Sequence, residues 1–220
     1  LTVIGRSAFK SCPAITEITL GDSVEVIGEK AFVDCRMLRS LTMNDKVRII
    51  GNEAFKNCAA LQSIELPDSV VEIGSDAFSG CASLNEIVVP GKVTKIGSYA
   101  FDACKALKTV SLGSAVEEIA SSAFAKCNLI EEITLPKTVG QEAFYDCRGL
   151  KKVSFNPETT VIDKNTFNGC ASLIDVVIPN AVTEIREGAF SRCTNLRSVA
   201  LPIGLTLIGE SAFSGCTALE

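Results

Sequence analysis

The chain has 220 residues, with 21 Lys or Arg, 26 Asp or Glu, no histidine, a net charge of -5 and a sequence pI near 5.0. Nucleic acids and anionic membranes bind basic faces, so this balance argues against both as partners. The lack of histidine removes the commonest general base and the usual catalytic triads, and no glycine-rich phosphate loop occurs. We therefore expect neither an enzyme nor a cofactor, and no run of apolar residues approaches the roughly 18 of a membrane span.

Ten cysteines recur at a fixed interval, which is 23 residues in every step but one. A phenylalanine stands three residues before each of them. A period in the twenties is typical of stacked copies of one small unit, so we expect residues 1–220 to form a single solenoid of about nine and a half repeats. Neither end carries a polar cap, and we interpret the chain as a piece of a longer protein. The cysteines are Cys12, Cys35, Cys58, Cys81, Cys104, Cys127, Cys147, Cys170, Cys193 and Cys216.

The repeat from Cys81 to Cys104 shows the expected elements in chain order. Alternation of buried and exposed types predicts a short strand over residues 86–89. Pro90 cannot donate to a ladder and ends it. A second, shorter extended piece is expected over residues 93–96. The segment 97–104 predicts one helical turn, which places Phe and Cys on one face.

The residue before each cysteine is often one that tolerates the left-handed conformation, as Gly80 and Asn57 do. Ala103, Lys126 and Arg192 occupy the same position in other repeats. From these exceptions we expect the geometry of this position to vary along the chain.

The cysteines could form disulfides, bind metal or act as nucleophiles. Residues of one column point the same way, which disfavours disulfides between repeats. Metal sites need clustered ligands and catalytic thiols need a neighbouring base, and neither is evident. The interpretation that fits best is a small buried side chain packed beside phenylalanine.

The segment 66–84, LPDSVVEIGSDAFSGCASL, resembles the BspA-like, or treponemal-type, leucine-rich repeat family, and the resemblance covers essentially all 220 residues. It implies an α/β repeat fold: a right-handed leucine-rich-repeat solenoid with a parallel β-sheet on its concave face, and short strands, turns and short helical turns elsewhere. It also implies a cell-surface or secreted location and adhesion to host extracellular-matrix proteins or to other cells.

One repeat, at 127–147, has only 20 residues. The stretch LPKTVGQEAF passes from Val139 directly to Gly140, and we interpret the loss as the x-x-I of the other repeats. The next repeat also departs, with Asn156-Pro157 after its strand, Asp163 for glycine and Thr166 for alanine. Two interpretations stay open: drift on a tolerant surface, or a local change of curvature or a partner contact near 136–166.

The outward positions of the strand lie five and seven residues after each cysteine and form a flat, mildly acidic strip without an aromatic anchor. We predict a weak, multivalent protein-binding module, in which the strip contacts host or microbial surface proteins. The alternative is a structural spacer or an intracellular scaffold with no ligand on this segment. Cation binding by the carboxylates is a third, weaker hypothesis. The predicted binding residues are Glu17, Thr19, Thr42, Glu65, Glu86, Thr109, Glu132, Thr134, Lys152 and Asp175.

Overall fold

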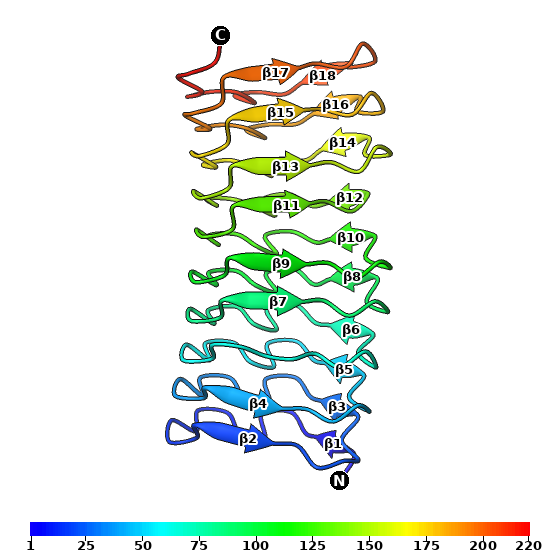
Figure 1. Ribbon diagram of the computed structural model, residues 1–220, viewed down its shortest axis with the longest axis vertical. Helices are drawn as coiled ribbons and strands as arrows, with labels where there is room; N and C mark the ends of the chain where they lie inside the picture. Colours follow the sequence, from blue (N-terminus) through cyan, green and yellow to red (C-terminus); the bar gives the residue numbers. More distant parts are fainter.

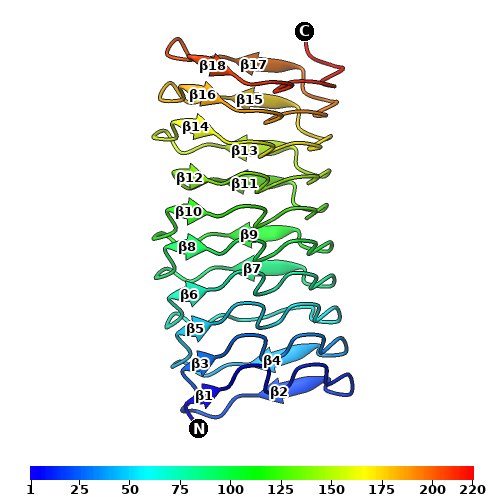
Figure 2. The ribbon, with the colours of Figure 1, turned by 180° about the vertical axis from the view of Figure 1, so that it is seen from behind.

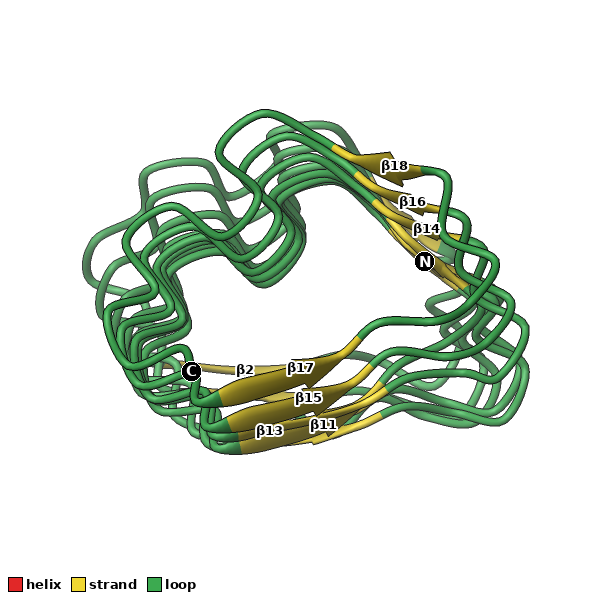
Figure 3. Cartoon of the chain, turned by 90° about the horizontal axis from the view of Figure 1, so that it is seen from above, coloured by secondary structure: helices red, strands yellow, loops and turns green.

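The computed structural model describes residues 1–220 as one stack of coils, with the two termini at opposite ends (Figures 1 and 2). Viewed along the stack, each coil has three sides: a longer strand, a shorter strand and a segment of turns (Figure 3). All strand pairs are parallel and join successive coils. The predicted parallel-strand solenoid is confirmed.

The longer strands follow the cysteines by five residues, as expected. Their middle residue points into the core and their outer residues point outward, because side chains alternate along a strand. They are β2 (Glu17–Thr19), β4 (Ser40–Thr42), β7 (Glu86–Val88), β9 (Thr109–Ser111), β11 (Glu132–Thr134), β13 (Lys152–Ser154), β15 (Asp175–Val177) and β17 (Ser198–Ala200).

The shorter strands form the second side. In most coils each of them is followed directly by a glycine, as β8 is by Gly97. Seven of them, from β1 to β12, make one continuous sheet, and β14, β16 and β18 make another. They are β1 (Val3–Ile4), β3 (Val26–Ile27), β5 (Ile49–Ile50), β6 (Glu72–Ile73), β8 (Lys95–Ile96), β10 (Glu118–Ile119), β12 (Thr138–Val139), β14 (Val161–Ile162), β16 (Glu184–Ile185) and β18 (Leu207–Ile208).

The ladder of longer strands is interrupted. It consists of four two-stranded sheets, β2-β4, β7-β9, β11-β13 and β15-β17, and residues 63–65, at the corresponding place in the coil between β4 and β7, form no strand. The repeat pattern predicts that stacking pairs every strand with its neighbours in parallel, and for the longer strands this prediction is wrong.

A column of phenylalanine rings runs through the core, among buried leucine, isoleucine, valine, alanine and cysteine side chains. Neighbouring rings stack nearly parallel, and Phe101 lies 5.3 Å from Phe78 and 5.2 Å from Phe124 between ring centroids. Phe101 is fully buried, and burial of such a side chain contributes about 1.5–3 kcal/mol. The expected phenylalanine column is confirmed.

The third side is not helical, which corrects the expectation of helical turns. In the segment 97–104, Ala100 N–H donates to Gly97 O at 3.2 Å and Cys104 N–H to Phe101 O at 3.2 Å, so each bond closes a tight turn. Tyr99 and Ala103 both have a φ of 57°, and a left-handed residue at such a position stops a right-handed helix.

The turns are also bonded to the next coil. Tyr99, Phe101 and Ala103 donate their N–H groups to the main-chain oxygens of Ser121, Ala123 and Ala125. Alternate residues thus bond within the coil and between coils, which satisfies the main chain without a helix.

Left-handed geometry before the cysteine is strict. Ala103, Lys126 and Arg192 adopt φ values of 57°, 60° and 59°, close to that of Asn57 at 61°. The expectation of variable geometry was wrong, because the bonds between coils hold every copy in one conformation whatever its side chain.

Candidate protein-binding face

The predicted strip lies on the side of the longer strands, which we call the long-strand face. It comprises the first and third residues of the eight longer strands, together with Ser63 and Glu65 of the strandless coil. Every residue predicted to bind a partner lies on this face and is exposed: Glu17, Thr19, Thr42, Glu65, Glu86, Thr109, Glu132, Thr134, Lys152 and Asp175.

The face is acidic, with one cation among its outward positions. Lys152 lies opposite Glu132 in the β11–β13 ladder. Asp175 accepts a hydrogen bond from Ser198 Oγ at 3.0 Å. Beside the face, Lys151 and Glu131 form an ion pair at 2.9 Å. The strip also exposes two aliphatic side chains, Val88 at 62% and Val177 at 77%.

Four of the predicted residues surround two hollows. Glu132, Thr134, Lys152 and Asp175 come from β11, β13 and β15. The other six predicted residues lie away from these hollows, spread over the coils from β2 to β9.

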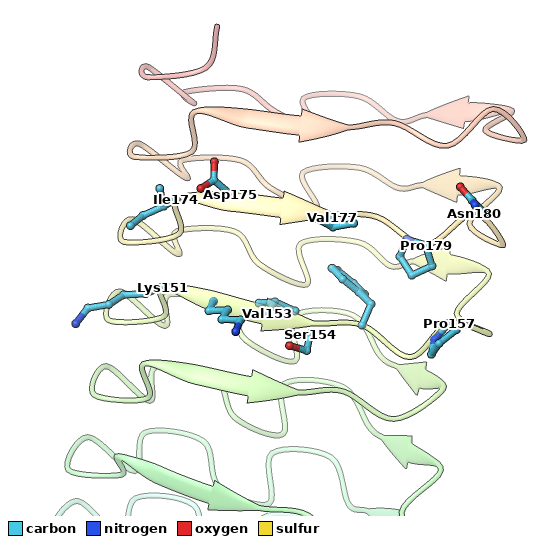
Figure 4. Close-up of a pocket in the computed structure, with 11 residues that line it drawn as sticks. Lys151, Val153, Ser154, Pro157, Ile174, Asp175, Val177, Pro179 and Asn180 are labelled. Carbon is cyan, nitrogen blue, oxygen red and sulfur yellow. The ribbon is translucent and has the colours of Figure 1, made fainter.

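The first hollow is an apolar groove of about 810 Å³ between β13 and β15, where the ladder is interrupted. Figure 4 shows Val153 and Val177 on the two strands, with Pro157 and Pro179 at one end of the groove. Phe155 also lines it and packs edge-on against Phe167 of the core column, at 5.8 Å between centroids.

The second hollow has a volume of about 640 Å³ and lies at the corner between the two strand sides. We call it the corner notch, and its polar lining includes Lys152, Ser154 and Asn156 beside Val116 and Pro136. Sequence reasoning missed Val116 as a candidate, and it named Asn156 only as a departure within the region 136–166 and not as a binding residue. The three residues missing from the repeat at 127–147 could have pointed to this corner. The sequence alone does not show which three are missing, because that depends on how the short coil pairs with its neighbours.

That register corrects the interpretation of the short repeat. Val139 pairs with Ile119, and Gly140 N–H donates to Ile119 O. Val139 therefore takes the place of the isoleucine that ends the other shorter strands. The absent residues are therefore those of the turn between the two strands, with its valine, and not the x-x-I.

The departures in the next repeats form contacts between coils. Arg186 donates to Asp163 Oδ1 at 3.2 Å, which pairs two of the residues that replace glycine after the shorter strands. Thr166 is buried, and its hydroxyl lies 3.4 Å from Gly140 O in the preceding coil and 2.9 Å from Asp163 O in its own. These substitutions are compatible with the stack and do not interrupt the turn side.

The buried cysteines have a structural role. Each buried thiol donates to the main-chain oxygen of the phenylalanine one coil earlier, as Cys58 does to Phe32 O at 3.2 Å. Burial raises the pKa of the Cys147 thiol to about 12, so it is protonated at neutral pH. All ten cysteines are free thiols. No group of three or more potential ligands is placed to hold a metal ion.

Parallel strands stacked coil on coil around a phenylalanine column define a solenoid of the leucine-rich-repeat type. The profile of the family described as BspA type leucine rich repeat region matches residues 2–131 and 117–220, and the chain belongs to this family. No curated protein matches the sequence.

Three solved structures illustrate the likeness. A leucine-rich repeat protein from Bacteroides ovatus is 26% identical, with a TM-score of 0.60, and the match covers 99% of this chain and 81% of that protein. The T. pallidum leucine-rich repeat protein is 29% identical, with a TM-score of 0.62 over 79% of this chain and 72% of its own. A leucine rich cell surface protein from Faecalibacterium prausnitzii is 26% identical, with a TM-score of 0.54 over 100% and 82%.

Proposed function

We propose that this chain is a non-enzymatic protein-binding module of a cell-surface protein, and that its long-strand face contacts host matrix proteins or other cells. The observation that supports this most directly is the repeated pair of outward side chains on each longer strand. The likeness to a protein described as a cell surface protein supports the location. No helix in the structure is both long and apolar enough to cross a membrane.

The chemistry of the face sets the expected mode of binding. Its outward side chains are short or acidic, and no tryptophan or tyrosine anchors the strip. Because aromatic and arginine anchors carry most interface energy, each site on the face binds weakly. Several coils acting together, or several copies on one surface, supply the avidity.

The test is the binding of the purified chain to immobilised extracellular-matrix proteins. The variant carrying Glu65→Lys, Glu86→Lys and Glu132→Lys reverses three charges on the face and should change both the affinity and its dependence on salt. The matched control carries Glu25→Lys, Glu72→Lys and Glu117→Lys, which change the same net charge beside the shorter strands.

Equal binding by the two triple variants would remove the long-strand face as the site. No binding to any matrix protein, even when the chain is displayed in many copies, would support the spacer or scaffold alternative instead.

A further inference from the structure

The corner between the two strand sides is built the same way in every full-length coil. A four-residue turn closes when the N–H of its last residue donates to the C=O of its first, as in Val70 to Pro67 and Val116 to Gly113 at 3.0 and 3.1 Å. The valine of this corner turn then points into the core. The short coil has no such turn, because Pro136 is followed at once by Lys137 and β12.

The missing turn leaves the valine of the preceding corner turn, Val116, less covered than its counterparts in the other coils. Val116 is 9% exposed, whereas Val70, Val93 and Val182 in the corresponding places are fully buried. An apolar surface that the column normally covers therefore opens into the corner notch.

The other wall of the notch carries an amide without a partner. Asn44 and Asn156 stand at the first position of their corner turns, and each accepts a main-chain N–H through Oδ1, from Lys46 and Glu158. Asn44 also donates its Nδ2 to Gly21 O at 2.7 Å and to Val24 O at 3.1 Å, both in the preceding corner turn. For Asn156 that preceding corner is the missing one, and its Nδ2 makes no hydrogen bond.

The rim of the notch is polar. Lys152 and Ser154 reach the notch from β13, and Lys152 has no ion-pair partner in the structure. The notch thus combines the slightly exposed Val116 with two side-chain donors, Asn156 Nδ2 and Lys152 Nζ, that have no acceptor within the protein.

We propose that the corner notch receives a turn of a partner protein, which takes the place of the missing corner. An aliphatic side chain of that turn packs against Val116, and one of its main-chain carbonyls accepts a hydrogen bond from Asn156 Nδ2. A polypeptide fits because the absent part is itself a turn of main chain, and one layer of main chain in the stack is about 4.8 Å thick. This inference rests on the proposed protein-binding function and names the place where a partner inserts.

A peptide that copies an intact corner serves as the probe. It is a cyclic peptide containing Leu-Pro-Asp-Ser-Val-Val, the sequence of residues 66–71, and its control has aspartate in place of the first valine. Methyl and amide NMR detects weak binding residue by residue. The methyl signals of Val116 and the side-chain amide of Asn156 should shift, while those of Val93 should not. Shifts with the control peptide equal to those with the probe would overturn the proposal.

Insertion of Asp-Ser-Val between Pro136 and Lys137 gives the short coil a corner turn like the one that residues 67–70 form in their own coil. The variant should keep the fold and lose the peptide-induced shifts. Asn156→Asp provides a second test that does not depend on the insertion folding, because it keeps the acceptor for Glu158 N–H and removes the donor. It should weaken peptide binding about fivefold, whereas Asn44→Asp should leave peptide binding unchanged.

The absence of peptide-induced shifts, or shifts that persist in the insertion variant, would overturn the proposal. Notch signals that move with protein concentration alone would assign the notch to a second copy and would also overturn it. Binding to matrix proteins is measured separately on the same samples. Matrix binding that fails while the peptide still binds would count against the proposed function alone.

Discussion

The thiol of Cys104 donates a hydrogen bond to the main-chain oxygen of Phe78, one coil earlier, with Sγ and O 3.3 Å apart. The same oxygen accepts the N–H of Cys81, at 3.1 Å, which closes a turn in its own coil. The cysteine column therefore joins each coil to the one before it, beyond filling a slot beside the rings.

Cys104→Ala should lower the free energy of unfolding by about 1–2 kcal/mol, because it removes the hydrogen bond and leaves a small void in a fully buried site. Urea denaturation gives the value. Cys12→Ala is the control, since Cys12 is only half-buried and has no phenylalanine oxygen one coil earlier. Equal losses in the two variants would mean that the bond between coils contributes nothing.

Phe101→Ala should cost about 3–5 kcal/mol, because the ring is fully buried between two stacked neighbours. Phe9→Ala should cost clearly less, since Phe9 is 38% exposed and has one stacked neighbour. The two midpoints of chemical denaturation are compared at one pH. An unchanged midpoint for Phe101→Ala would show that this ring is not part of the core.

Ala103→Asn should stabilise the chain slightly, by about 0.5 kcal/mol, because asparagine tolerates positive φ better than alanine does. Ala103→Val should destabilise it by about 1–2 kcal/mol, since a branched side chain is strained at a φ of 57°. If residues 97–104 were instead helical, Ala103→Asn would weaken the helix, because asparagine has a lower helix propensity than alanine. Thermal unfolding of the two variants thus separates a left-handed turn from a helical one by the sign of the first change.

Stability should fall as the pH rises above about 9. Burial raises the pKa of Cys147 from 9.0 to about 12, and burial also raises those of Cys104, Cys127 and Cys170. The unfolded chain releases these protons at lower pH than the folded chain, so the stabilisation is complete below pH 9 and is lost toward pH 12.

Each such thiol contributes up to about 1.4 kcal/mol per pH unit within that window. Urea midpoints at pH 8 and pH 10.5 measure the slope. Cys147→Ala should make the slope shallower than in the native chain, and an identical slope would contradict the assignment to this thiol.

The repeat pattern was sufficient for the architecture. Ten Phe–Cys pairs at one spacing predict the stack, the ring column and the outward strip, because each coil can bury its apolar residues only against a copy of itself. Strands β7 (residues 86–88) and β8 (residues 95–96) lie within the ranges 86–89 and 93–96 that the sequence predicts to be extended.

Contacts between coils determined the remainder. Residues 97–104 have helical spacing of Phe and Cys, yet main-chain bonds to the next coil impose left-handed φ on Tyr99 and Ala103. The sequence also does not show which successive longer strands fail to pair, because each of these strands stands at the same distance from its cysteine.

The sequence by itself determined the number of coils, the core column and the location of the one short coil, since these follow from counting residues. The tertiary structure decided which residues the short coil lacks. Val139 could belong to the valine column or the isoleucine column by spacing, and pairing with Ile119 selects the second. Hydrogen bonds between strands fix the register in which Val139 pairs with Ile119. In this register the short coil lacks its corner turn, and the notch lies beside Val116 and Asn156.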